Sequence, residues 1–130
     1  MKLQNKDIRP LINFLNTMKV GGRKSLGRTK LKEKLTKQLE VFGNDQTAVI
    51  DEFDGWTDKE TGHFTTENKE LNKALNDLAF EEIEITYNSP FKKDFVELLE
   101  NYEEELDGTN ADAYAKLYEK LVEEKEKGNE

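Results

Sequence analysis

The longest regular hydrophobic pattern runs from about Ser25 to Asp54 and predicts one long helix. Positions at steps of three and four form a seam on one face, while Lys, Glu, Thr and Asp occupy the other faces. The seam consists of Leu31, Leu35, Leu39, Phe42, Gln46, Val49 or Ile50, and Phe53. About 30 residues make roughly 45 Å of helix, so the other elements are expected to pack along it. Gly43 leaves open a kink or a break at Phe42–Asn44.

Two shorter amphipathic helices are predicted on either side of the long one. The first covers about Lys6 to Met18, with Pro10 in its first turn, and Val20-Gly21-Gly22 ends it. The second begins at Thr65 or Thr66. Its apolar face consists of Leu71, Ala74, Leu75 and Leu78.

The C-terminal third predicts two more helices and a charged tail. Ser89-Pro90 is a strong helix start, and one face then carries Phe91, Phe95, Leu98, Leu99, Tyr102 and Leu106. Asp107-Gly108 ends this helix, and Thr109 or Asn110 begins the last one. The stripe of the last helix is Tyr114, Leu117, Tyr118, Leu121 and Val122. Residues 125–130 are expected to fray.

Strict alternation of apolar and polar residues marks the β-structure. Glu82 to Tyr87 alternates, as does Met1 to Gln4, and a lone strand cannot satisfy its own backbone. We therefore expect residues 1–4 and 82–87 to form a two-stranded antiparallel pairing. Residues 56–65 are predicted to form a small protruding hairpin with Gly62 in its turn. The predicted fold is a single mainly α domain over residues 1–130, with about five helices around the long one and a minor β element.

Composition narrows the functional classes. The chain is 35% hydrophobic and 37% charged, has no Cys, and contains no apolar run long enough for a membrane span. It predicts a protein that stays in the cytoplasm where it is made. The net charge of −8 is unevenly spread: residues 1–40 hold 11 Lys/Arg against 3 Asp/Glu (+8), and residues 41–130 hold 9 against 25 (−16). Either the two halves pair within the fold, or they meet charged partners.

The sequence offers no convincing catalytic, cofactor or metal site. His63 is the only His and has no identifiable partner for acid–base chemistry. The Gly21-Gly22-Arg23-Lys24-Ser25 stretch lacks the spacing of a phosphate-binding loop. The acidic stretches that begin at Asp51 and Asp107 lack oxygen ligands at required EF-hand positions and are better interpreted as helix ends.

Two charged surfaces remain as candidate binding sites. The basic patch consists of Arg23, Lys24, Arg28, Lys30 and Lys34. No aromatic residue interleaves it for base stacking, and the whole chain is acidic, which argues against a nucleic-acid partner. Residues 97–112 contain no Lys or Arg and predict an acidic helical face that could meet a basic protein surface. Its candidate contacts are Glu100, Glu103, Glu104, Glu105 and Asp107, joined by Trp56 and Phe64 on the hairpin. Solubility alone would also explain the acidic face.

Several segments together resemble a known family. They are Met1-Lys2-Leu3-Gln4-Asn5-Lys6-Asp7-Ile8, Leu11-Ile12-Asn13-Phe14-Leu15, the basic start of the long helix, Glu82–Ile85, and Leu106-Asp107-Gly108-Thr109-Asn110-Ala111 with Tyr114, Leu117 and Tyr118. The chain resembles small uncharacterised proteins of phages and prophages of Gram-positive bacteria. The resemblance implies synthesis in a bacterial host cytoplasm and a role in binding, and it supplies no catalytic residues.

From these observations we expect a non-enzymatic phage protein that acts through protein–protein contacts, as a virion-assembly accessory or structural component. The expected partner is a phage structural protein or a host protein. The alternative is a host-directed inhibitor, active against defence or replication, whose acidic face mimics nucleic acid. The length of the central helix also allows a helical homodimer.

Overall fold

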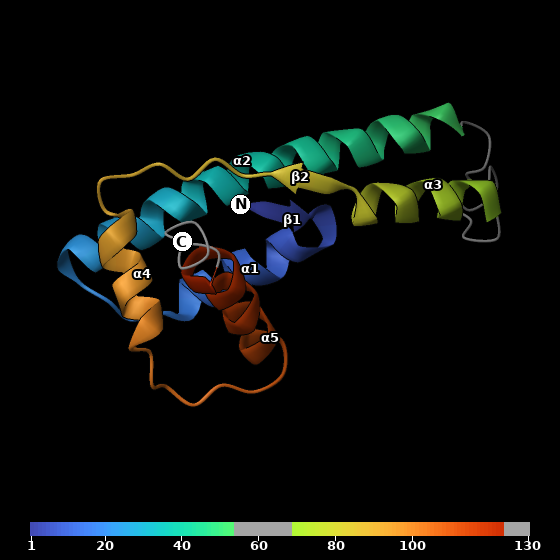
Figure 1. The fold of residues 1–130 in the computed structure, drawn as a ribbon. Coiled ribbons are helices and arrows are strands. Elements are labelled where there is room, and N and C mark those ends of the chain that lie inside the picture. The colour runs from blue at the N-terminus through green and yellow to red at the C-terminus, as the bar shows by residue number, and fades with distance from the viewer. Residues whose placement is uncertain (54–68, 124–130) are drawn as a thin grey trace.

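The long helix α2 (Gly22–Glu52) organises the computed structural model, which describes residues 1–53 and 69–123 (Figure 1). Around it these ranges contain strand β1 (Lys2–Gln4), a 3-10 turn (Asn5–Asp7), α1 (Ile8–Thr17), α3 (Lys69–Phe80), strand β2 (Glu82–Glu84), α4 (Lys92–Glu100), α5 (Gly108–Leu117) and a π-helical turn η2 (Tyr118–Glu123). The predicted mainly α fold with a minor β element is confirmed. The expected hairpin at 56–65, the cap at Thr65 or Thr66 and the tail at 125–130 lie outside the described residues.

Helix α2 passes through Gly43 without a break, which answers the question that the sequence left open. A Gly in a helix interior costs about 1 kcal/mol relative to Ala. Burial of the preceding residue, Phe42, contributes to the stability of the helix at this point. The N-terminus of α2 lies at Gly22, whose φ of +61° suits glycine, three residues before the predicted start at about Ser25.

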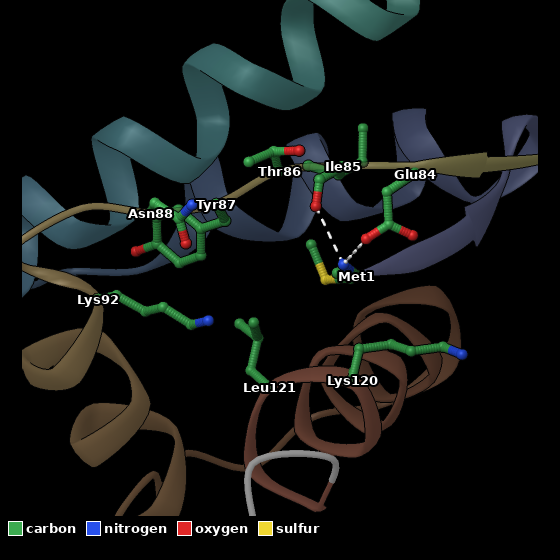
Figure 2. A pocket seen from close by; sticks show the side chains of 9 residues that line it. All are labelled: Met1, Glu84, Ile85, Thr86, Tyr87, Asn88, Lys92, Lys120 and Leu121. Carbon is green, nitrogen blue, oxygen red and sulfur yellow. Dashed lines mark hydrogen bonds and ion pairs between the residues drawn. The ribbon is translucent and has the colours of Figure 1, made fainter. Parts of the chain in front are cut away.

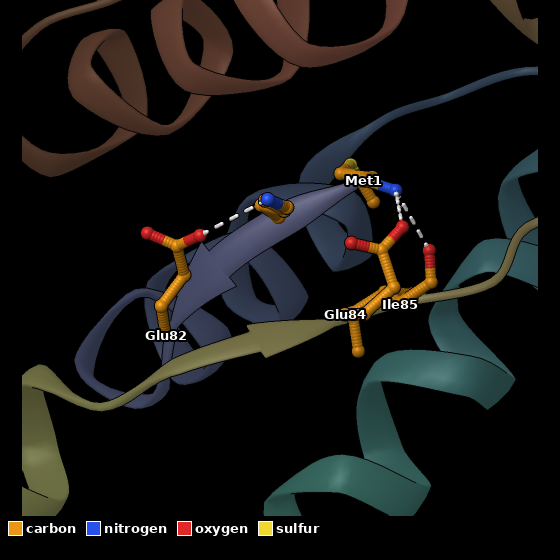
Figure 3. Close-up of polar contacts among 5 residues, drawn as sticks. Met1, Glu82, Glu84 and Ile85 are labelled. Atoms are coloured by element: carbon orange, nitrogen blue, oxygen red, sulfur yellow. Dashed lines mark hydrogen bonds and ion pairs between the residues drawn. The ribbon is translucent and has the colours of Figure 1, made fainter.

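The predicted strand pairing is confirmed with an antiparallel register of Lys2 to Glu84, Leu3 to Ile83 and Gln4 to Glu82. Beyond the assigned strands, the Ile85 amide donates to the Met1 carbonyl at 2.8 Å, and the N-terminal ammonium donates to the Ile85 carbonyl at 3.0 Å (Figure 3). Strand β2 is shorter than the predicted 82–87, because the chain leaves β1 after Ile85.

Two helix starts differ from their predictions for local reasons. Helix α1 begins at Ile8, because residues 5–7 form a 3-10 turn in which Asp7 accepts the Gln4 amide at 3.1 Å. Helix α4 begins at Lys92 and not at Ser89-Pro90. The Ser89 hydroxyl accepts the Phe91 amide at 3.1 Å and the Ser89 carbonyl accepts the Lys92 amide at 3.0 Å, so these residues form a turn in front of the helix.

The core gathers around α1, which packs against α2 and α5, while α4 packs against α2 and η2. The fully buried large side chains are Ile8, Leu11, Phe14, Leu15, Leu31, Leu35, Leu71, Phe95, Val96, Leu99, Leu117 and Val122. Leu31 and Leu35 show that the first half of the α2 seam is buried within one chain. The second half of α2 extends beside α3 as an arm, away from the other helices (Figure 1).

Asn5 is the buried polar residue of the described core and joins three elements. Its amide donates to the Glu81 carbonyl at 3.1 Å, and its side-chain Nδ2 donates to the Leu78 carbonyl at 3.0 Å. Its Oδ1 accepts Gln38 Nε2 at 3.0 Å. The start of the chain is thereby fixed to α2 and to the end of α3.

Gly27 allows α2 and α4 to approach each other closely. A Cβ at this position would lie 2.5 Å from the Phe91 carbonyl oxygen and 2.7 Å from the Phe95 Cβ. The Gly27 carbonyl also accepts the hydroxyl of the buried Tyr87 at 2.6 Å. Helix α2, the connection after β2, and helix α4 therefore meet at this one residue.

Replacing the two α2 glycines by Ala should have opposite effects on stability. Gly27→Ala forces the helices apart, and we expect it to lower the free energy of unfolding by about 1–3 kcal/mol despite its better helix propensity. Gly43→Ala meets no atom within 4 Å and should raise stability by up to about 1 kcal/mol. Urea unfolding of both variants measures this difference, and equal effects would contradict the close approach.

The Asn5→Asp variant should be unstable in a pH-dependent way. At pH 7 the buried carboxylate would face the Leu78 carbonyl without a proton to donate, which we expect to cost more than about 3 kcal/mol. Burial would raise the pKa of this carboxyl in the folded state, so stability should return as the pH falls toward the ordinary Asp pKa of about 3.9. The unfolding midpoints of the variant and of the original protein are measured at pH 4.5 and at pH 7. The difference between the two proteins should be smaller at pH 4.5.

Candidate functional site

The acidic candidates lie on the connection between α4 and α5, which we call the acidic segment (residues 101–107). Glu103, Glu104, Glu105 and Asp107 are exposed there, and Glu100 is the exposed last residue of α4. Between these carboxylates, Tyr102 and Leu106 are partly buried and pack against the core. The segment is thus anchored at two points and displays its charges to solvent.

The prediction that a helix continues to Leu106 and carries these charges on a helical face is wrong. Helix α4 ends at Glu100, and Asn101 closes it with its amide and its Nδ2, which donate to the Glu97 carbonyl at 3.2 and 2.9 Å. A longer helix would place Glu103–Glu105 at its C-terminal end, where the helix dipole is negative and opposes carboxylates. Three consecutive like charges add further repulsion.

Aromatic packing holds the start of the acidic segment. The Tyr102 ring stacks on Tyr114 at 5.4 Å between centroids and meets Phe14 edge-on at 6.0 Å. The Tyr114 hydroxyl donates to the Leu99 carbonyl at 2.7 Å, which ties α5 to the end of α4. Burial raises the pKa of the Tyr102 hydroxyl, and the Glu104 carboxylate raises it further. The ring therefore stays neutral beside the acidic residues at physiological pH.

A groove of about 520 Å³ runs beside the acidic segment. It is lined by Lys19, Val20, Leu98, Asn101, Tyr102 and Glu103–Glu105. Leu98 and Tyr102 supply apolar surface, and the carboxylates supply negative charge. A groove of this kind can accept a Lys or Arg side chain, whose aliphatic stem packs on apolar surface while its charged end meets carboxylates.

The basic candidates share helix α2 but do not form one free surface. Arg23 Nε donates to Asp94 of α4 at 3.1 Å, and its guanidinium lies 5.1 Å from the centre of the Phe91 ring. Arg28 donates to the Met18 carbonyl at 2.5 Å. Lys30 and Glu33 form an ion pair at 4.0 Å. The Arg23 and Arg28 contacts hold α2 against α4 and the end of α1, and the Lys30–Glu33 pair lies within α2. Lys24 and Lys34 have no ion pair with the part of the chain that the structure describes.

A pocket of about 370 Å³ lies where β2, the connection after it and η2 meet (Figure 2). The N-terminal ammonium contacts Glu84 Oε1 at 2.7 Å on one side, and Lys92 points in from α4. The hydrogen bond from the ammonium holds the pKa of the Glu84 carboxyl below its usual range. Burial raises the pKa of the Tyr87 hydroxyl, which keeps it as a neutral donor to Gly27.

The remaining candidates and absences concern specific parts of the chain. Trp56, Phe64 and His63 lie outside the described residues. Within residues 1–53 and 69–123, no group of three or more Asp, Glu or His side chains could hold a metal ion. In the same ranges no helix is long and apolar enough to cross a membrane.

Sequence reasoning missed Gly27, Asn5 and the anchoring role of Tyr102. Gly27 carried a usable signal, because an isolated Gly within a helical pattern often marks close packing. Asn5 precedes a predicted helix, where an Asn commonly acts as a cap, but its side chain bonds to Leu78 and Gln38, which are far away in the sequence. Tyr102 gave no distinguishing signal, because its position agrees equally well with a helix that continues through it and with the anchor seen in the structure.

Comparison with known proteins gives a family but no characterised relative. A family model described as "Protein of unknown function (DUF1617)" matches residues 1–129. No curated protein and no solved structure matches the chain. The chain belongs to the DUF1617 family.

Changing the Tyr102 anchor should loosen the acidic segment selectively. Tyr102→Ala removes the contacts with Phe14 and Tyr114, and we expect about 1–3 kcal/mol of lost stability, because the ring is only partly buried. Amide exchange at Glu103–Glu105 should become faster. Tyr102→Phe keeps the ring and should retain both properties. Hydrogen exchange followed by NMR measures the effect, and faster exchange in the Phe variant would contradict anchoring by the ring.

Proposed function

We propose that this member of the DUF1617 family is a non-enzymatic phage protein that acts by binding another protein. The observation that carries the proposal is the acidic segment, with its exposed carboxylates held between two anchored side chains. We assign it to virion assembly, as an accessory or structural component. The expected partner is a phage structural protein with a basic surface.

Anchoring makes the acidic segment suited to recognition. Binding costs free energy when flexible groups must be ordered at the interface, and a connection already held at Tyr102 and Leu106 avoids part of that cost. Exposed charges at an interface mainly increase the association rate and select the partner. The neighbouring groove beside Leu98 adds apolar surface that contributes to affinity.

The phage assignment rests on the sequence resemblance described above. It implies synthesis in the cytoplasm of a bacterial host, and an assembly component can also remain in the virion. The acidic segment is the non-helical connection between α4 and α5, and it projects beyond these two helices (Figure 1).

One observation favours the alternative, an inhibitor that mimics nucleic acid at a host defence or replication protein. Glu103, Glu104 and Glu105 are consecutive and lie outside any helix. A non-helical chain advances by up to about 3.3–3.6 Å per residue, so its charge per unit length approaches that of one DNA strand, which carries one charge per roughly 3.4 Å of helix axis. The same segment would then occupy a basic nucleic-acid site.

Charge reversal in the acidic segment tests both forms of the proposal. We expect the triple variant Glu103→Lys, Glu104→Lys and Glu105→Lys to lose at least about tenfold in partner capture, since about 1.4 kcal/mol corresponds to that factor. The matched control is Glu40→Lys, Asp45→Lys and Glu52→Lys, which changes the net charge equally at exposed positions of α2. Tagged proteins are used for capture from nuclease-treated host lysates, with and without infection, and captured proteins are quantified by mass spectrometry.

Capture from infected and uninfected lysates distinguishes the assembly role from the inhibitor role. Phage structural proteins captured only after infection, and lost in the acidic-segment variant, support the assembly role. A host protein that handles DNA or RNA, captured without infection and lost in the same variant, supports the inhibitor. Equal capture by both triple variants would refute the acidic segment as the binding site.

A further inference from the structure

One edge of the two-stranded sheet has backbone groups that face outward. The bonds between Met1 and Ile85 and from Asn5 to Glu81 fix which residues form the hydrogen-bonded pairs of the ladder. In an antiparallel pair these positions alternate, so Leu3 and Ile83 form the pair between them. The amide and carbonyl groups of Glu82, Glu84 and Thr86 therefore point away from β1.

Helix α2 borders this outer edge and leaves a groove. The groove has a volume of about 190 Å³ and is lined by Lys34, Lys37, Gln38, Val41, Glu84, Ile85 and Thr86. Among the described residues, no protein group is bonded to the outward amide of Glu84 or Thr86. Unpaired donors and acceptors along a strand edge are a template for an additional strand.

The charge of the groove indicates what kind of strand fits. Lys34 and Lys37 are exposed and form no ion pair with the described residues, although the protein as a whole is acidic. Val41 lies on the same face of α2 and is 48% exposed. Positions 34, 37 and 41 follow the helix at steps of three and four, so the groove presents two cations and then an apolar side chain.

We propose that the outer edge of β2 binds an extended acidic segment of a partner protein, which adds as a third strand beside Lys34 and Lys37. The ladder would supply affinity through main-chain hydrogen bonds, and alternate side chains would supply specificity. From Lys37 to Val41 the helix rises about 6 Å, close to the two-residue repeat of a strand, which is about 6.6 Å. The segment recognised thus carries a carboxylate and an apolar residue two positions apart. This inference rests on the proposed protein-binding function and adds a second contact to it.

A synthetic peptide tests the edge directly. The probe is a fluorescein-labelled heptapeptide, Thr-Glu-Thr-Glu-Thr-Val-Thr, which places two carboxylates and then an apolar side chain at two-residue steps on one face. It is titrated into the full chain. Fluorescence anisotropy gives its affinity, and ¹⁵N NMR locates its contacts. We expect saturable binding, with amide shifts centred on Glu82, Glu84 and Thr86. Methylating the backbone nitrogens that face β2 removes the donors without changing the charge, and this peptide should bind at least about tenfold more weakly.

Protein variants test the charge. Lys34→Glu with Lys37→Glu should weaken peptide binding at least about tenfold. The matched pair Lys69→Glu with Lys73→Glu, on exposed positions of α3, should leave it unchanged. Equal binding of the methylated peptide, shifts away from β2, or no binding at millimolar peptide would overturn the proposal. If the peptide test fails but partner capture from lysate still depends on Glu103–Glu105, the proposed function stands and only the strand-edge proposal is refuted.

Discussion

The close approach of α2 and α4 at Gly27 is the constraint on which the arrangement of the other elements depends. The missing side chain allows the Phe91 carbonyl and the Phe95 Cβ to lie against the helix, and the Gly27 carbonyl accepts the Tyr87 hydroxyl. Tyr87 in turn fixes the direction in which the chain leaves β2. The position of α4 then decides where the acidic segment begins, so the displayed carboxylates depend on a contact made in the core.

The sequence could predict the elements better than their ends. Helix α2 and the pairing of β1 with β2 follow from periodicity, together with the requirement that a strand must find a partner. The end of α4 could not be predicted in this way, because Tyr102 and Leu106 continue the helical period. Both side chains pack against the core, as they would on a helix that continued, although this segment is not helical. Asn101 and the adjacent carboxylates favour an end of the helix at Glu100.

Long-range contacts set the other limit of prediction. Gly27 meets Phe91 and Tyr87, and Asn5 meets Leu78 and Gln38, all of which are far away in the sequence. A single sequence indicates that such residues are unusual but does not indicate their partners. The candidate binding residues were found by their charge, whereas the side chains that position them were found only in the structure. For the basic residues the structure also changed the interpretation, since Arg23 and Arg28 serve mainly to join elements.

The sheet has a consequence for how the chain folds during synthesis. Strand β1 is synthesised about 80 residues before its partner β2. At roughly 5–20 residues per second this delay is about 4–16 s. During that time Leu3 lacks its strand partner, and the apolar face of α1 lacks α5, which is synthesised later still. The nascent N-terminal region thus exposes apolar surface and an unpaired strand edge, and slow translation would lengthen the period in which it can aggregate.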